Sequence, residues 1–505
     1  MLVIGATACT ISAGPAPTPT PTDPPPSTQT PPPTATQTPL PTATATVTQT
    51  PLPTATPTIT PTATQTPLPT TTPAEVAAFT SDNWGQTDIP AFVNSGLVEP
   101  YIAFLNLNDR DNLGGVLTPQ PGTGVQTLYY SPPRNRAARI EILQLPESTG
   151  NRVYVAPDGL GIAYFIEAGE GRAPGLYLSE LESGLDIRLI SMDTLLQRGF
   201  VVEPAWQPDG EAFAMMLATG YATDIFLVQR DGLWRNLTQS GAYDLFPAFS
   251  PNGDYLAFVS DREVCPTWIP EQPGTCDGTD TPPPDGGHLH VMEMATGEVT
   301  KLADVWITPG NAPQWVNDRQ IAFAAGEPLF GDTERTLWLA DVQSGQSREV
   351  RPQDVASPLM LAEAWSPDGT QVLYQAAGVD SSVSLLGVNG STVGSLSQFN
   401  YPRYGVAASW APNSDTVAVG GVGGQCPFGA TVLDDTLGVV TNGNPPPSMC
   451  TPRYSPAGEY IAFTGVSLNR FDGRADVYVA NPNGQSALNM TGDLRGTMTL
   501  LGWIR

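Results

Sequence analysis

Apolar and polar residues alternate in short segments from about residue 85 onward, and clusters of Gly, Asn, Asp and Pro separate these segments. One unit recurs: an aromatic residue, a tight turn and a short apolar strand. Its clear copies are AWQPDGEAFAM from Ala205, AFSPNGDYLAF from Ala248, AWSPDGTQVLY from Ala364, SWAPNSDTVAV from Ser409 and RYSPAGEYIAF from Arg453, and two looser copies are YVAPDGLGIAYF from Tyr154 and QWVNDRQIAF from Gln314. Because proline presets φ in a turn and Asn, Asp or Gly tolerates positive φ, each copy predicts a β-hairpin.

The register of this repeat is constant along the chain. Each apolar strand starts five residues after the turn proline or its replacement, at Ile162, Phe213, Leu256, Ile321, Val372, Val417 and Ile461. A degenerate copy from Ile89 leads into YIAF at Tyr101, and successive strands are then 43 to 65 residues apart. A four-stranded propeller blade needs about 40 to 50 residues. The sequence therefore predicts an all-β fold, a β-propeller of eight four-stranded blades, with seven blades as the alternative.

The aromatic residues of the repeat are predicted to pack between neighbouring blades, because one hairpin sheet cannot bury its faces alone. These residues are Trp206, Phe249, Trp315, Trp365, Trp410 and Tyr454. The chain ends in LLGWIR, an aromatic strand without its turn. We expect this strand to join the first blade, which closes the ring and removes an exposed sheet edge.

The N-terminal part has a different composition. The opening MLVIGATAC resembles the end of a bacterial lipoprotein signal peptide, so residues 1–13 are a predicted signal or lipobox remnant and Cys9 a predicted lipidation site. Residues 14–79 are mostly Pro and Thr, which predicts a disordered, extended stalk. Residues 80–505 are then the propeller domain, and its membrane contact is through the N-terminal lipid alone.

Charge narrows the classes of partner. The chain carries 49 acidic and 22 basic residues, a net charge of −27, and its single lysine is Lys301. Phosphate recognition depends on Lys and Arg, so we expect no nucleic-acid partner. An acidic surface of this kind is typical of a plain solvated exterior.

The five cysteines are Cys9 and two locally spaced pairs, Cys265 with Cys276 and Cys426 with Cys450. Neither pair has the CxxC spacing of a zinc site. Both pairs are predicted disulfides, which indicates an oxidising, extracytoplasmic compartment at the cell surface or in the periplasm. Free thiols are the alternative.

The repeat PxWSPDGxxIAF, with FVSDRE from Phe258 as its continuation, resembles the WD-repeat-like units of the TolB family. It is also similar to the propeller domains of prolyl-oligopeptidase-type peptidases. The resemblance covers nearly everything after about residue 85, and it implies a protein-binding platform or an accessory domain.

Candidate chemistry is sparse. A serine peptidase of the prolyl-oligopeptidase type needs GxSxG, which this sequence lacks. His288 and His290 are two residues apart on a predicted strand, so they face one side and can share a metal; a hydrogen-bonded pair at a strand start is the alternative. Asp109 and Asp111 are oxygen ligands suited to calcium, although their spacing departs from a full calcium loop. We predict no catalytic residue and no cofactor beyond such a calcium ion.

These patterns predict an extracytoplasmic, lipid-anchored, monomeric binding module for a protein, peptide or envelope glycan. The loops from Cys265 to His290 and from Cys426 to Cys450 are its predicted distinctive surfaces, while the binding residues themselves are unknown. On this interpretation the chain is not an enzyme. The alternative is a propeller lyase or hydrolase acting on glycans, with carboxylates from different blades meeting at the axial channel.

Overall fold

The computed structural model describes residues 99–111, 120–121, 123–146, 151–167, 172–192, 203–219, 222–265, 286–308, 312–325, 336–350, 358–376, 382–396, 406–422, 426, 431–441, 447–466 and 473–504. All of them belong to the second of two compact units, Thr71–Arg505. The signal remnant, Cys9 and the stalk at 14–79 lie outside the described residues, and they stay predictions.

The described part of the chain is built from antiparallel sheets. The first sheet contains β33 (Thr497–Ile504), β1 (Tyr101–Leu107), β4 (Gln126–Ser131) and β5 (Ile140–Leu145); the second β6 (Arg152–Val155), β7 (Gly161–Ile166), β8 (Gly175–Glu180) and β9 (Leu185–Ser191); the third β10 (Ala205–Trp206), β11 (Ala212–Thr219), β12 (Ala222–Gln229) and β13 (Trp234–Asn236). The fourth contains β14 (Asp244–Phe249), β15 (Tyr255–Ser260), β16 (His288–Glu293) and β17 (Val299–Lys301); the fifth β18 (Gln314–Trp315), β19 (Gln320–Ala325), β20 (Thr336–Asp341) and β21 (Gln346–Glu349); the sixth β22 (Pro358–Trp365), β23 (Gln371–Ala376), β24 (Val383–Gly387) and β25 (Thr392–Leu396).

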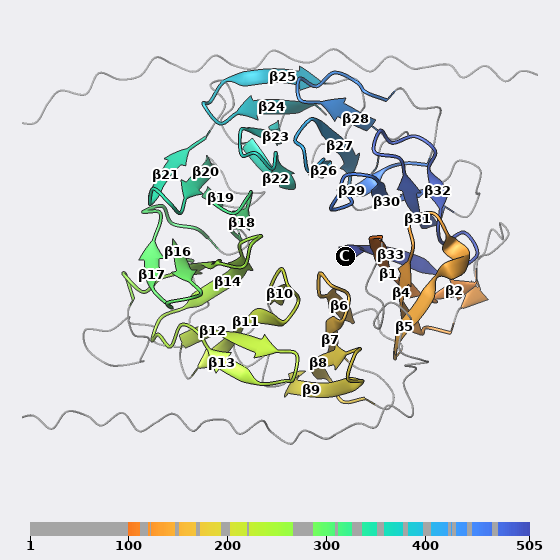
Figure 1. Ribbon diagram of the computed structural model, residues 1–505, viewed down its shortest axis with the longest axis horizontal. Helices are drawn as coiled ribbons and strands as arrows, with labels where there is room; N and C mark the ends of the chain where they lie inside the picture. The colour runs from red at the N-terminus through yellow and green to blue at the C-terminus, as the bar shows by residue number, and fades with distance from the viewer. Residues whose placement is uncertain are drawn as a thin grey trace, which may run out of the picture. The chain divides into compact units, whose positions relative to one another are not determined.

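The seventh sheet has seven strands: β26 (Val406–Trp410), β27 (Thr416–Gly421), β28 (Thr431–Asp434), β29 (Cys450–Tyr454), β30 (Ile461–Val466), β31 (Ala475–Ala480) and β32 (Leu488–Asn489). A two-stranded hairpin of β2 (Arg110–Asp111) and β3 (Gln120–Pro121) and one 3₁₀ turn, η2 (Arg136–Ala138), complete the described elements. The predicted all-β propeller is confirmed, with the first strand of each sheet nearest the centre (Figure 1). The number of blades stays a prediction, because β27 and β29 pair at one parallel position, Gly421 with Cys450, and so join two antiparallel groups into one sheet.

The repeated turn is formed as the sequence predicts. Gly210 follows Pro208 and Asp209 with φ of +74°, a left-handed conformation that costs other residues energy. Its Cα also lies against the preceding sheet's turn, since a Cβ at this position would be 2.6 Å from the Asp158 carboxylate. Neighbouring turns therefore touch, and glycine is required for both conformation and space.

The repeat aromatics lie between sheets, and several make one recurring hydrogen bond. The indole N–H donates to a carbonyl on the innermost strand of the preceding antiparallel group, in the pairs Trp206 with Tyr154 (3.1 Å), Trp315 with Ala248 (2.8 Å), Trp410 with Ala364 (2.9 Å) and Trp503 with Arg453 (2.9 Å). These bonds link neighbouring sheets near the centre of the ring. A buried indole N–H usually has such a partner, so these four tryptophans supply both packing and orientation.

The C-terminal strand closes the ring. β33 pairs with β1 from Tyr101 opposite Ile504 to Leu107 opposite Thr497, as expected for LLGWIR. The loop after β4 reinforces this junction, because Arg139 forms an ion pair with Asp493 at 2.7 Å. The first blade is thus made from both ends of the propeller sequence.

The two ends of the strands differ in what they carry. Strands alternate in direction, so the turns from first to second and from third to fourth strand share one end, which we call the turn face. The links from second to third strand, and from one sheet to the next, share the other end, the connection face. The repeated PDG-type turns are on the turn face, whereas the strand ends that the longest links join, such as Ser260 of β15 and His288 of β16, are on the connection face.

Candidate functional site

The connection-face end of the fourth sheet gathers an unusual set of charged and aromatic side chains. We call Asp244, Arg262, Glu263, His288, His290, Lys301 and Asp304 the fourth-sheet cluster. It contains both histidines and the single lysine of the chain. The sequence brings these residues together because Asp244 and His288 start strands and His290 is the third residue of β16. Lys301 ends a strand, and the others follow strand ends.

Lys301 is held between two carboxylates. Its Nζ lies 2.5 Å from Glu263 Oε2 and 2.5 Å from Asp304 Oδ1. These hydrogen bonds lower the pKa of the Glu263 and Asp304 carboxyls and raise the pKa of Lys301. All three groups are accessible to water, so this charge triad contributes little to stability.

Arg262 and Asp244 form the buried part of the cluster. The Asp244 side chain is fully buried and accepts hydrogen bonds from Arg262 Nη2 at 2.9 Å and Ser240 Oγ at 2.7 Å. The Arg262 guanidinium also lies 5.1 Å from the ring centre of Phe258. A buried carboxylate needs such compensation, so this pair fixes the start of β14 beneath the exposed triad.

His290 occupies a position that the repeat fills with aromatic rings. Its ring stacks on Phe258 across the sheet, with centroids 5.8 Å apart. The same cross-strand pairing occurs in other sheets, as Tyr129 with Phe104, Tyr177 with Tyr164, Trp338 with Phe323 and Tyr478 with Phe463. Burial lowers the pKa of His290 to about 4, so the ring is neutral at pH 7. His290 therefore packs as an aromatic residue.

The histidine pair shows the hydrogen bond that was the alternative to metal binding. His290 Nδ1 lies 3.0 Å from the carbonyl oxygen of His288. His288 packs edge-on against Trp306 at 5.3 Å, and its buried Nδ1 has no hydrogen-bond partner in the part of the chain that the structure describes. Within the described ranges, no three His, Cys, Asp or Glu side chains are grouped so that they could hold a metal ion.

The other predicted calcium residues lie at the first sheet. Asp109 accepts hydrogen bonds from Thr497 Oγ1 at 3.0 and 3.2 Å, which ties the link after β1 to the closing strand. Asp111 ends β2 opposite Gln120. Calcium binding at these two residues stays a prediction.

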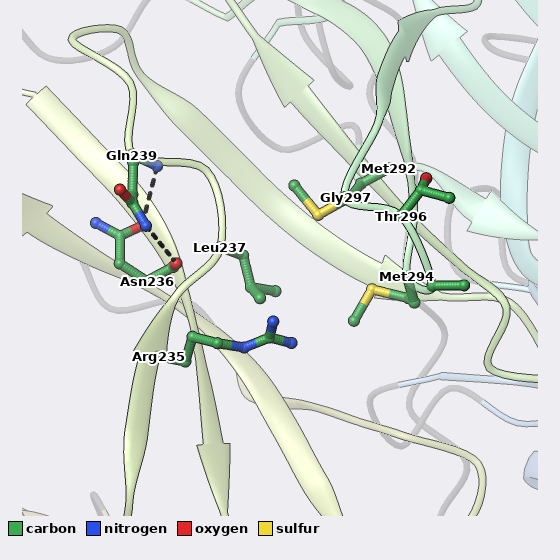
Figure 2. A pocket seen from close by; sticks show the side chains of 9 residues that line it. Arg235, Asn236, Leu237, Gln239, Met292, Met294, Thr296 and Gly297 are labelled. Atoms are coloured by element: carbon green, nitrogen blue, oxygen red, sulfur yellow. Dashed lines mark hydrogen bonds between the residues drawn. The ribbon is translucent and has the colours of Figure 1, made fainter.

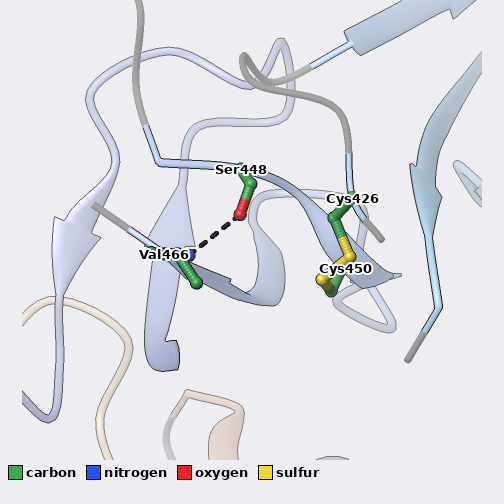
Figure 3. Close-up of a disulfide and its surroundings, with 4 residues drawn as sticks. All are labelled: Cys426, Ser448, Cys450 and Val466. Carbon is green, nitrogen blue, oxygen red and sulfur yellow. Dashed lines mark hydrogen bonds between the residues drawn. A yellow bond between two sulfur atoms is a disulfide. The ribbon is translucent and has the colours of Figure 1, made fainter. Parts of the chain in front are cut away.

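One of the two predicted disulfides lies within the described chain. Cys426 and Cys450 are bonded, with Cα atoms 5.3 Å apart, and Ser448 Oγ accepts the Val466 N–H at 2.9 Å beside them (Figure 3). Cys450 starts β29, an innermost strand, so the bond pins the link after β27 to the connection face near the centre. Cys265 is buried after β15, and its predicted partner Cys276 is outside the described residues.

A second group of polar residues, on the innermost strands, was missed by sequence reasoning. One position of the repeat, directly before the aromatic residue, is small in most copies, as at Ala205, Ala248, Ala364, Ser409 and Gly502. In three copies this position holds a larger polar residue instead, namely Tyr154, Gln314 or Arg453. Burial, followed by the nearby Glu203 charge, raises the pKa of Tyr154 to about 12, and the Arg152 charge opposes this rise. This break in the repeat was the available signal.

Comparison with known proteins places the fold. The chain matches no protein-family model. It is 38% identical over 109 residues to a TolB homologue of Chlorobium luteolum, a match that covers 21% of this chain and 23% of that protein. It is 32% identical over 117 residues to a putative tricorn-like protease C-terminal subunit of Sulfurisphaera tokodaii, covering 23% of this chain and 13% of that protein. It is 26% identical over 189 residues to dipeptidyl-peptidase 5 of Porphyromonas gingivalis, covering 34% of this chain and 25% of that protein. The matched segments thus span a quarter or less of these relatives. The chain is a TolB-like β-propeller.

These relatives correct one prediction. We expected the chain not to be an enzyme, because it lacks GxSxG and its repeat residues serve the fold. Two of the three relatives are named as peptidases. The repeat is shared with enzymes, so the prediction was wrong to treat this architecture as evidence against enzyme activity.

Among the described residues, no helix is both long and apolar enough to cross a membrane.

Proposed function

We propose that this chain is an extracytoplasmic binding module whose connection face holds a protein or peptide ligand. The observation that carries the proposal is the difference between the two faces. Contacting PDG-type turns occupy the turn face, whereas the disulfide, the fourth-sheet cluster and the Arg152, Tyr154 and Glu203 group all lie on or open toward the connection face. Rigid strands that carry variable links are the usual way in which a scaffold positions a binding surface.

The charges on this face favour a ligand with both signs of charge. Arg152 and Lys301 present cationic groups, and Glu203, Glu263 and Asp304 present carboxylates. A peptide backbone with mixed side chains matches such a surface, and complementary rim charges raise specificity and association rate more than affinity. The peptidase names among the relatives also favour a peptide. Peptide cleavage, by this chain or by a peptidase that it serves, is accordingly the second candidate function.

The remaining parts of the proposal concern location. A lipid on Cys9 and a Pro/Thr stalk over residues 14–79 would hold the propeller away from a membrane surface. The Cys426–Cys450 disulfide supports an oxidising compartment. Labelling with radioactive palmitate, in cells that express the chain and its Cys9→Ala variant, tests the tether.

Selection from a random peptide library tests the binding function. The full chain is immobilised, enriched peptides are resynthesised, and their dissociation constants are measured by calorimetry. We expect Glu203→Gln to weaken the selected peptides by about tenfold, as for loss of one charged hydrogen bond. Glu459→Gln, an exposed turn-face change, is the matched control and leaves affinity unchanged.

Mass spectrometry of the same mixtures then distinguishes the two functions. Retained, intact peptides support a binding module. Cleaved peptides establish the second function instead, and a library from which nothing is enriched, or equal losses for Glu203→Gln and Glu459→Gln, contradicts the role of the connection face.

A further inference from the structure

A pocket of about 240 Å³ lies on the outer rim of the propeller, between the third and fourth sheets. One wall is formed by β13 and the residues after it, and the other by the β16–β17 hairpin (Figure 2). β13 is the outermost strand of its sheet, far from the innermost strands (Figure 1). The pocket is therefore separate from the surface discussed above, and the inference below does not depend on the proposed function.

The floor of this rim pocket is apolar and adaptable. Leu237 points inward from one wall, and Met292 and Met294 point inward from the other (Figure 2). Met292 is buried, and it packs with Ile225 in the core between the two sheets, so the pocket opens directly onto that core. Methionine side chains fill irregular space and adjust to different apolar groups.

Within the described residues, the polar side chains of the pocket are hydrogen-bonded to the protein, apart from Arg235. Asn236 Nδ2 donates to Asp224 at 2.8 Å, Gln239 Nε2 donates to the Asn236 carbonyl at 3.2 Å, and Thr296 Oγ1 donates to Glu293 at 2.7 Å. Arg235 is exposed and extends toward the methionines (Figure 2). Among the residues that the structure describes, no carboxylate forms an ion pair with it.

This combination specifies a ligand. An arginine without an acidic partner, in a chain with 49 acidic and 22 basic residues, favours an anion at this place and above all a carboxylate, which guanidinium binds in a bidentate manner. The apolar floor favours an adjoining hydrocarbon group. The volume is below the roughly 300 Å³ at which sites for drug-sized ligands begin, so one side chain fills it.

We propose that the rim pocket binds the carboxyl-terminal residue of a peptide when that residue has an apolar side chain. The side chain enters between Leu237 and the two methionines, and the terminal carboxylate pairs with Arg235. Binding is weak for a single residue because the site is shallow and partly open. Its contribution in a longer partner adds to contacts elsewhere on the propeller.

Methyl NMR of the full chain, labelled with ¹³C at the ten methionine methyl groups, tests the proposal. Met292→Leu and Met294→Leu assign the two pocket signals, and the other methionine signals report on folding. The probes are N-acetyl-leucine, its uncharged amide N-acetyl-leucinamide, and N-acetyl-glycine. We expect saturable shifts of the two pocket signals with N-acetyl-leucine, and affinity about tenfold lower when either the charge or the side chain is absent.

Arginine variants complete the test. Arg235→Gln removes the preference for N-acetyl-leucine over its amide, while Arg348→Gln, an exposed change on the outermost strand of the fifth sheet, keeps it. The proposal fails if the amide binds as well as the acid, if Arg348→Gln has the same effect as Arg235→Gln, or if the pocket signals do not respond.

Discussion

The tryptophans at the repeat position allow the hydrogen bond between sheets to be measured against an internal control. Trp410 and Trp365 occupy the same place in neighbouring sheets, and each is 6% exposed. The Trp410 N–H donates to the Ala364 carbonyl at 2.9 Å, whereas the buried Trp365 N–H has no hydrogen-bond partner among the described residues. Replacing each by phenylalanine removes the same atoms, so the lost packing is similar and the hydrogen bond is the difference.

The expected magnitude follows from what each change leaves behind. Trp410→Phe leaves the Ala364 carbonyl without its donor, which costs about 1–3 kcal/mol for a buried group, in addition to the packing loss. Trp365→Phe removes an unpaired N–H and so recovers a desolvation cost. We expect Trp410→Phe to reduce the free energy of unfolding by about 1–3 kcal/mol more than Trp365→Phe does.

Urea denaturation followed by tryptophan fluorescence and by far-ultraviolet circular dichroism provides the assay, with agreement between the two probes as the test of two-state behaviour. The two variants are compared by midpoint at equal m-value. Equal midpoints, or a lower midpoint for Trp365→Phe, would refute the reasoning, because the hydrogen bond would then contribute nothing measurable to the contact between sheets.

Three further predictions concern the disulfide, the repeated turn and the buried histidine. Replacing both Cys426 and Cys450 by serine should destabilise the propeller by about 3 kcal/mol in denaturant titrations, the chain-entropy value for a 24-residue separation, and no change would mean that the link is already ordered without the bond. Gly210→Ala should lower the melting temperature more than Gly297→Ala. The two glycines share a φ near +74°, but a methyl group at Gly210 would clash with Asp158, whereas one at Gly297 meets nothing within 4 Å. Equal shifts would show that backbone conformation alone matters. The pKa of His290 is about 4 in the folded chain and about 6.5 in the unfolded chain, so protonation of the unfolded chain lowers stability as the pH falls from 6.5 toward 4. The free energy of unfolding should decrease by up to about 3 kcal/mol over this range. His290→Tyr should flatten this part of the stability profile, and an unchanged slope would assign it to other groups.

The sequence predicts the fold well because the fold is repeated. Seven copies of one turn and strand pattern fix the register of the sheets, and the unpaired strand at the C-terminus indicates how the ring closes. The first strand of the ring is predicted less clearly, because the copy of the repeat from Ile89 is degenerate. The disulfide between Cys426 and Cys450 was also predictable, because short separations suit a bond within a link.

The candidate sites are harder to predict, because their members come from different strands or from different sheets. Lys301 meets Glu263 only when β15 and β17 pair with opposite edges of β16, and nothing in either segment alone indicates the ion pair. Arg235 and Met294 are 59 residues apart and face each other across two sheets. Contacts of this kind depend on how sheets are placed, which the repeat pattern does not record.

His290 and Tyr154 show how the repeat can still separate structural from functional residues. His290 is chemically distinctive, yet it stands where other sheets have tyrosine or tryptophan. Packing of an aromatic ring against the neighbouring strand therefore explains its presence. Tyr154 is a common residue, yet it stands where most copies have alanine, serine or glycine, and its pKa is perturbed by the charges of Arg152 and Glu203. In a repeat protein, a residue is therefore informative when it departs from its own position in the other copies, and by that measure Tyr154 and Arg453 are better starting points for mutagenesis than either histidine.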